Sequence, residues 1–174
     1  MSELRALGRL AAPLMLQQIG LQLMGGHGPD AGDPSFDAAE LANTALGGTF
    51  ASRLNRRLRE ELGYTYGIYA SYDRGARGGA WRVSTSLRTD VTVDGIREAL
   101  AIIAATRAEP LPTAEFAKAQ AYLIQQLPLG FETNRSIVAS FDELVRRARP
   151  LTDYAAFERR ITALTPTAAK AAGS

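Results

Sequence analysis

Residues 41–69 read LANTALGGTFASRLNRRLREELGYTYGIY, and this stretch predicts a helix that leads into a β-strand. Its first part places an apolar residue at every fourth position, the spacing of one buried helix face: Leu46, Phe50, Leu54 and Leu58. Gly63 stands where a glycine commonly ends a helix. Because a glycine in a helix interior costs about 1 kcal/mol, Gly47 and Gly48 indicate a bend or a close approach by another backbone.

After Gly63 the helical spacing gives way to alternation, which is typical of half-buried strands. The expected apolar face of the first strand consists of Tyr64, Tyr66, Ile68 and Ala70. A turn at 73–79 follows, and the second strand then alternates from Trp81 to Leu87. This pattern predicts an antiparallel hairpin with one apolar face. Since two strands alone are marginally stable, further strands or a helix layer must complete the sheet.

Amphipathic helices are expected through the rest of the chain. Apolar residues recur at helical spacing within 93–103, 116–127, 137–145 and 154–164. Thr165 followed by Pro166 is typical of one more helix start. The order of a helix, a hairpin and several helices, without a repeat, indicates an α+β fold. In this fold a small antiparallel sheet carries helices packed on one face.

The first 25 residues also show roughly helical apolar spacing, and we interpret them as an amphipathic helix. A secretory signal is less favoured, because Glu3 precedes the apolar run and no A-x-A site follows it. The segment is too short and too polar to span a bilayer. Residues 25–34, GGHGPDAGDP, predict a loop around His27. We therefore expect a divergent segment with a Gly/Pro linker at 1–33 and a domain at 34–174, in the periplasm or the cytoplasm.

Composition excludes several kinds of site. The 174 residues include no cysteine and one histidine, so neither a cysteine-based zinc site nor an H-E-x-x-H site can form. Twenty basic and 18 acidic residues give a net charge of +2, which does not predict a nucleic-acid binder. One expected helix carries an arginine cluster with no interleaved aromatic residue to stack on bases. We interpret this cluster as a solvated face paired with acidic residues: Arg53, Arg56, Arg57 and Arg59.

Three elements of the opening stretch resemble the signature of the insulinase/pitrilysin family of zinc metallopeptidases, in its C-terminal homologous domain. They are L-G-G-x-F-x-S-R-L at 46–54, L-R-E at 58–60 and G-x-x-Y at 63–66. The later L-P-x-x-F-E-T at 127–133 and I-x-A-L-T-P at 161–166 also fit. The resemblance covers about residues 34–172.

The resemblance implies a clamshell of two homologous halves. One half binds zinc through H-x-x-E-H, and the other lacks the metal and closes the substrate chamber. This sequence has no H-x-x-E-H, so it is similar to the second half. The expected partners are then a zinc-bearing half, fused or separate, and a peptide substrate, with no cofactor in this chain. No activity is expected from the chain alone.

By the same resemblance, Arg59 and Tyr66 reach toward the zinc site of the other half, contact the substrate backbone and stabilise the tetrahedral intermediate. Charge builds on a peptide carbonyl oxygen when water attacks it, and a guanidinium and a phenol O–H are suitable donors. Tyr64, two residues from Tyr66, is a second candidate for substrate binding. The alternative interpretation gives neither residue a functional role. In it, Tyr66 is one more half-buried tyrosine of the strand, and Arg59 forms an ion pair with a nearby glutamate.

Two departures from the family pattern bear on the sheet. The family domain opens with a strand that residues 1–33 do not match, and it ends with a strand after the last helix. We therefore expect one or both edge strands to be missing. Two other functions stay open: an inert peptidase-like scaffold or subunit-binding protein and, more remotely, a nucleic-acid binder that uses the arginine-rich helix.

Overall fold

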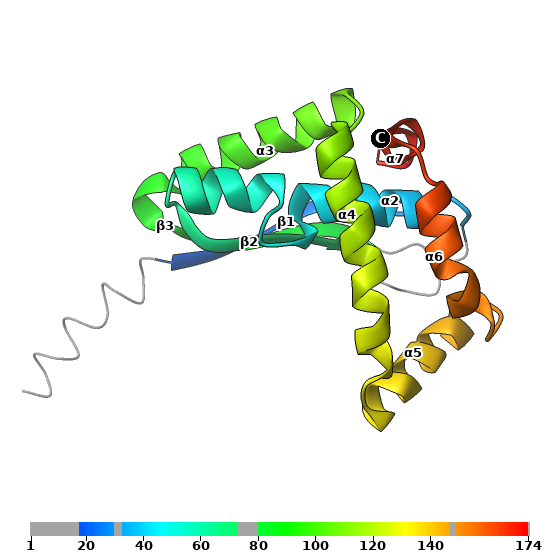
Figure 1. Cartoon of the computed structure of the whole chain (residues 1–174). Coiled ribbons are helices and arrows are strands. Elements are labelled where there is room, and N and C mark those ends of the chain that lie inside the picture. The colour runs from blue at the N-terminus through cyan, green and yellow to red at the C-terminus, as the bar shows by residue number, and fades with distance from the viewer. Residues whose placement is uncertain (1–17, 30–32, 73–79, 147–148, 174) are drawn as a thin grey trace, which may run out of the picture.

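The computed structural model describes residues 18–29, 33–72, 80–146 and 149–173 (Figure 1). Its sheet has three strands: β1 (Gln18–His27), β2 (Thr65–Tyr72) and β3 (Ala80–Arg88). Both pairings are antiparallel, and the order is β1-β3-β2. The helices lie on one side of this sheet (Figure 1). The predicted α+β fold, a small antiparallel sheet with helices on one face, is confirmed.

The N-terminal segment differs from its prediction. Strand β1 pairs with β3 from Gln18 opposite Arg88 to His27 opposite Ala80. The predicted helix is therefore wrong for residues 18–25, and the predicted loop is wrong for 25–27. An edge strand is present where it was expected to be missing. In sequence, Ile19, Leu21 and Leu23 alternate with other residues, and pairing along β3 favours this period of two over a helix. Residues 1–17 lie outside the described part of the chain.

The predicted single helix before β2 is broken. It comprises α2 (Phe36–Asn43), a wider turn η1 (Thr44–Gly48) and, after a gap, a second wide-turned helix η2 (Asn55–Glu61). Thr49 is extended, with φ −136° and ψ 166°. A Cβ placed on Gly47 would lie 2.6 Å from the Cβ of Ala70 in β2. Gly47 therefore marks a close approach of helix and strand, one of the two interpretations of the glycine pair.

The break changes the predicted apolar face. Leu46, Leu54 and Leu58 are buried as expected. Phe50 is 53% exposed, so its predicted burial is wrong, because the extended backbone before it carries it out of the helical register. Gly63 ends η2 with a φ of 61°, which confirms its predicted position at the helix end.

Two buried asparagines attach these helices to strand β2. Asn55 Nδ2 donates to the Ile68 carbonyl at 2.7 Å, and Asn55 Oδ1 accepts from the Ile68 N–H at 3.2 Å. Asn43 Nδ2 donates to the Ala70 carbonyl at 3.0 Å. Strand β2 lies at an edge of the sheet, so these bonds satisfy backbone groups that its single neighbouring strand leaves free.

The main core lies between the sheet, η2 and α3 (Thr92–Ala108), which follows a short 3-10 turn, η3 (Thr89–Val91). A Cβ on Gly95 would lie 2.9 Å from Leu87 Cδ1, so α3 packs closely on β3. This contact determines which face of α3 turns toward the sheet. The sequence predicted an apolar face within 93–103 that includes Leu100, but Leu100 is exposed, so this part of the prediction is wrong. The core cluster consists of Leu46, Leu54, Leu58, Ile68, Ala70, Val83, Leu87 and Ala99.

A second cluster gathers the C-terminal helices around α2. These are α4 (Thr113–Gln126), η4 (Leu127–Phe131), α5 (Asn134–Arg146), α6 (Asp153–Ala163) and α7 (Pro166–Ala172). Thr165 accepts the N–H of Ala168 at 3.2 Å, which confirms the predicted start of the last helix. The buried members are Leu41, Ala45, Leu111, Phe116, Ala119, Ile161 and Ala169.

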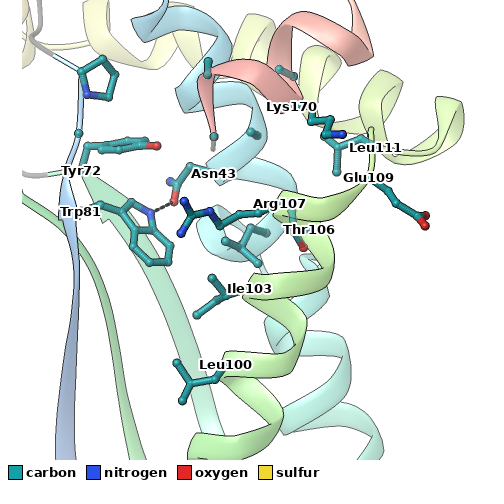
Figure 2. Close-up of a pocket in the computed structure, with 17 residues that line it drawn as sticks. Asn43, Tyr72, Trp81, Leu100, Ile103, Thr106, Arg107, Glu109, Leu111 and Lys170 are labelled. Carbon is teal, nitrogen blue, oxygen red and sulfur yellow. Dashed lines mark hydrogen bonds between the residues drawn. The ribbon is translucent and has the colours of Figure 1, made fainter.

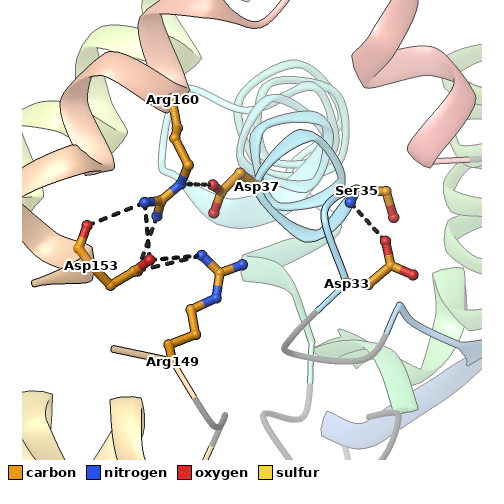
Figure 3. Close-up of polar contacts among 6 residues, drawn as sticks. All are labelled: Asp33, Ser35, Asp37, Arg149, Asp153 and Arg160. Atoms are coloured by element: carbon orange, nitrogen blue, oxygen red, sulfur yellow. Dashed lines mark hydrogen bonds and ion pairs between the residues drawn. The ribbon is translucent and has the colours of Figure 1, made fainter. Parts of the chain in front are cut away.

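An ion network ties α6 to α2 (Figure 3). The guanidinium of Arg160 donates to Asp37 in α2 at 2.7 Å and to Asp153 at the start of α6 at 3.0 Å. Arg149 donates to the same Asp153 at 3.3 Å. Partial burial lowers the pKa of Arg160, but the bonds and charges of Asp37 and Asp153 outweigh it, so that the pKa is raised overall. Arg160 therefore stays charged and fixes the two helices together.

Candidate functional site

A β-bulge in β2 determines which way its tyrosines point. Thr65 lies opposite Leu87 and Ile68 opposite Thr85, so three steps on β2 match two on β3. Ile68 and Ala70 face the core, whereas Tyr66 is 87% exposed. The prediction that Tyr66 shares the apolar face with Ile68 and Ala70 is therefore wrong, because the extra residue of the bulge reverses the alternation at Tyr66.

Two threonines hold the bulge in place. The Oγ1 of Thr65 accepts the Gly67 N–H at 3.1 Å and lies 2.8 Å from the Oγ1 of Thr85. Thr85 Oγ1 in turn donates to the Gly67 carbonyl at 2.9 Å. Both backbone groups of Gly67 are thus bound by side chains. These hydrogen bonds stabilise the bulge and thereby the outward direction of Tyr66.

Arg59 and Tyr66 lie close together. The guanidinium carbon of Arg59 lies 4.6 Å from the centre of the Phe50 ring and 6.0 Å from the centre of the Tyr66 ring. These distances suit cation–π attraction. The Arg59 side chain is 33% exposed, and its carboxylate contact is with Glu60 at 3.8 Å. A partly accessible cation therefore lies over two aromatic rings.

A fourth side chain extends this group. The rings of Phe50 and Tyr69 meet edge to face, with centroids 6.1 Å apart, and Tyr69 is partly exposed. We call Phe50, Arg59, Tyr66 and Tyr69 the arginine–aromatic patch. The sequence did not mark Phe50 or Tyr69 as site residues. Phe50 was missed because its i+4 spacing from Leu46 and Leu54 assigned it to the buried helix face. Tyr69 was missed because the bulge that turns Tyr66 to the same side leaves no signal in the local sequence.

Tyr64 does not join this patch. Its side chain is half buried and packs against the main core. Its N–H donates to the Leu58 carbonyl at 2.8 Å, across the end of η2. The bulge separates it from Tyr66, so the two tyrosines differ in their surroundings. Contact of Tyr64 with a substrate stays a prediction, and its position favours a packing role.

The other arginines of the cluster bind carboxylates of neighbouring helices. Arg53 Nε lies 2.6 Å from Glu115, and Arg57 Nε lies 3.0 Å from Glu98. The hydrogen bond from Arg57 lowers the pKa of Glu98, and the same bond raises the pKa of Arg57. This cluster is a paired face that connects η2 to α3 and α4, which weighs against a nucleic-acid surface.

The patch contains no metal ligands of its own. Within the described ranges, no group of three or more histidine, aspartate or glutamate side chains could hold a metal ion. The residues of this chain therefore do not fit a zinc site there. What the patch offers is a positive charge and a phenol O–H on an accessible surface.

Comparison with known families settles the relationship. A model of the peptidase M16 inactive domain matches residues 16–123 of the chain. The chain belongs to this family. The match includes β1, β2, β3, the helices between β1 and β2, α3 and most of α4, and it therefore contains Arg59 and Tyr66.

Solved structures share this fold. The M16 inactive domain of Pseudomonas fluorescens is 26% identical and has a TM-score of 0.80, with 90% of this chain and 37% of that chain covered. A protease from Helicobacter pylori is 11% identical, with a TM-score of 0.76 and coverage of 90% and 37%. A chain of complex III2 from Candida albicans is 17% identical, with a TM-score of 0.75 and coverage of 88% and 39%.

The chain thus spans 37% of the length of the P. fluorescens chain. No curated protein matched the sequence. In the portion that the structure describes, none of the helices combines the length and the apolar character that a bilayer crossing requires.

Proposed function

We propose that this M16 inactive domain is the zinc-free half of a metalloendopeptidase and closes the substrate chamber opposite a zinc-bearing half. In this function the arginine–aromatic patch faces the peptide. Arg59 and Tyr66 donate to the peptide carbonyl oxygen as it becomes negatively charged. The proximity of the Arg59 guanidinium and the Tyr66 ring on an open surface carries the proposal.

The exposure of Tyr66 supports this role. A tyrosine that served packing alone would bury its ring, as Ile68 and Ala70 on the same strand bury their side chains. Instead, the bulge directs Tyr66 outward, and bulges often re-aim side chains next to active sites. The phenol O–H is thereby available to a ligand.

The patch also supplies rigidity, which charge stabilisation requires. Donors that are fixed before the reaction need no reorganisation when charge develops. The Arg59 guanidinium lies over the Phe50 and Tyr66 rings, and the backbone beside Tyr66 is fixed by the threonine bonds at Gly67. A guanidinium and a phenol carried by this supported backbone can therefore meet one developing oxyanion.

The zinc ion belongs to the partner half in this proposal. It would supply Lewis-acid chemistry there. The part of this chain is to bind and orient the peptide, to exclude water when the halves close, and to place a guanidinium and a phenol at the carbonyl oxygen. A chain that spans little more than a third of its P. fluorescens relative is compatible with one half of a larger unit.

A reconstitution assay tests the proposal. The chain and an H-x-x-E-H half from the same genome are purified separately, and cleavage of a peptide library is measured for each half and for the mixture. We expect cleavage from the mixture only. Cleavage by the zinc half at the same rate without this chain would contradict the proposal.

A scaffold that binds subunits without peptidase work is the second candidate. The fold of this chain also occurs in a chain of complex III2 from C. albicans. Stable binding to a partner with no change in peptide cleavage would favour the scaffold. The retained pair Arg59 and Tyr66 favours the peptidase half.

A further inference from the structure

A cavity lies at the end of β2 that is farther from Tyr66. It is bounded by the last turns of α3, by α7, by the end of α2 and by the ends of β2 and β3 (Figure 2). Its volume is about 320 Å³, at the lower end of the range for small-ligand pockets. Tyr72 on its wall is six residues along β2 from Tyr66, or about 20 Å at the rise of a strand. None of the four patch residues lines this cavity, so it is distinct from the proposed peptidase surface.

The walls of the cavity are largely apolar. Leu46, Ile103 and Leu111 line it, and so does Leu100, which is 52% exposed on α3. Trp81 forms another wall, and its indole N–H donates to Asn43 Oδ1 at 2.8 Å, which fixes the orientation of the ring. The exposure of Leu100 thus has a structural context, since its side chain is one side of a preformed apolar cavity.

A cation extends into this apolar space. The side chain of Arg107 reaches from the last turn of α3 toward Asn43 and Trp81 (Figure 2). No described residue forms an ion pair or hydrogen bond with Arg107. Lys170 of α7 adds a second positive charge to the lining, whereas the carboxylate of Glu109 points away from the cavity (Figure 2).

We propose that this cavity binds an apolar carboxylate, with its acid group on Arg107 and its hydrocarbon part against Trp81, Leu100 and Ile103. A guanidinium binds a carboxylate through two parallel hydrogen bonds. An apolar tail gains by leaving water for the leucine and isoleucine walls. The volume admits a hydrocarbon chain or one large side chain, so the ligand is a medium-chain acid or the C-terminal residue of an apolar peptide.

Trp81 provides a direct readout, because it is the one tryptophan in the sequence. The chain is titrated with decanoate and, separately, with decan-1-ol, and the fluorescence of Trp81 is followed. We expect saturable binding of decanoate that is at least about tenfold tighter than that of the alcohol. The absence of a saturable signal, for both decanoate and the peptides below, would overturn the proposal.

Variants place the acid group. Arg107→Gln should weaken decanoate binding about tenfold and leave decanol binding unchanged. Arg97→Gln is the matched control, because Arg97 lies on the same helix and pairs with Asp94 at 3.4 Å outside the cavity. Equal decanoate affinity in Arg107→Gln and wild type would overturn the assignment. Leu100→Glu should abolish binding of decanoate, and circular dichroism checks that it folds.

A second pair of probes separates the two sources of the acid. Acetyl-trileucine with a free C-terminus is compared with the same peptide as its C-terminal amide. Tighter binding of the free acid supports a peptide terminus as the ligand, and binding of decanoate alone supports a free acid. Equal binding of the peptide acid and amide, together with equal binding of decanoate and decanol, would overturn the proposal.

Discussion

The side chain of Asn55 exchanges two hydrogen bonds with the backbone of Ile68, one to its carbonyl at 2.7 Å and one from its N–H at 3.2 Å. Asn55 therefore satisfies the N–H and carbonyl of Ile68 at the free edge of β2, as the backbone of a neighbouring strand would. This contact holds η2 beside β2, and η2 carries Arg59 whereas β2 carries Tyr66. The geometry of the patch depends on it.

Removal of this contact should lower stability. Asn55→Ala leaves a buried N–H and a buried carbonyl of Ile68 without their partner, and each such group costs about 1–3 kcal/mol. We expect the free energy of unfolding to fall by about 2 kcal/mol or more, measured by urea denaturation. Asn134→Ala, at the exposed start of α5, is the control and should change stability by less than about 0.5 kcal/mol.

The two neighbouring glycines should respond differently to alanine. A Cβ at Gly47 would meet the Ala70 backbone nitrogen at 2.9 Å, so Gly47→Ala forces helix and strand apart and should cost about 1–3 kcal/mol. The nearest atom to a Cβ at Gly48 is the Asn43 carbonyl oxygen at 3.4 Å. Gly48→Ala should therefore be neutral or stabilising, because alanine favours a helix. Equal thermal shifts in both variants would contradict the close approach.

The bond between Arg57 and Glu98 should make stability depend on acid pH. Arg57 lowers the pKa of Glu98 below its ordinary 4.5. The stabilisation is therefore complete above pH 4.5 and is lost as the pH falls through the lower pKa of the folded state. Glu98→Gln should reduce stability at pH 7, and its difference from wild type should shrink steadily as the pH is lowered below 4.5. A difference from wild type that does not change with pH would show that the charge of Glu98 is irrelevant.

Phe50 should position Arg59 rather than stabilise the fold. Because Phe50 is exposed, Phe50→Leu should change the free energy of unfolding by less than about 1 kcal/mol. Loss of the aromatic ring removes a cation–π contact of about 0.5–1 kcal/mol. The order parameter of the Arg59 Nε–H group, measured by NMR relaxation, should fall. An unchanged order parameter would mean that other contacts fix the guanidinium.

Local sequence signals predicted those features that depend on neighbours along the chain. Gly63 was recognisable as a helix end because a positive φ favours glycine. The close approach at Gly47 was predictable because a glycine destabilises a helix interior and is expected there only where a larger side chain would not fit. Arg59 and Tyr66 became candidates through the resemblance of their motif to the family signature, and the structure places them near each other.

Features that depend on pairing across the sheet were not predictable in this way. The bulge at Tyr66 is supported by hydrogen bonds among Thr65, Gly67 and Thr85. Thr65 and Gly67 lie on β2, but Thr85 lies on β3. The strand β1 exists because β3 offers it a partner, and its apolar residues fit a helical spacing nearly as well. Phe50 matched the core spacing until the backbone extended at Thr49.

The turnover number of the reconstituted peptidase tests the central claim most directly. Tyr66→Phe removes one hydroxyl from an exposed side chain, so the fold should persist while one donor to the oxyanion is lost. We expect kcat to fall by about 10²–10³, with Tyr122→Phe, a partly exposed tyrosine on α4, as the unchanged control. A kcat for Tyr66→Phe equal to that of wild type would contradict the role of the arginine–aromatic patch in catalysis.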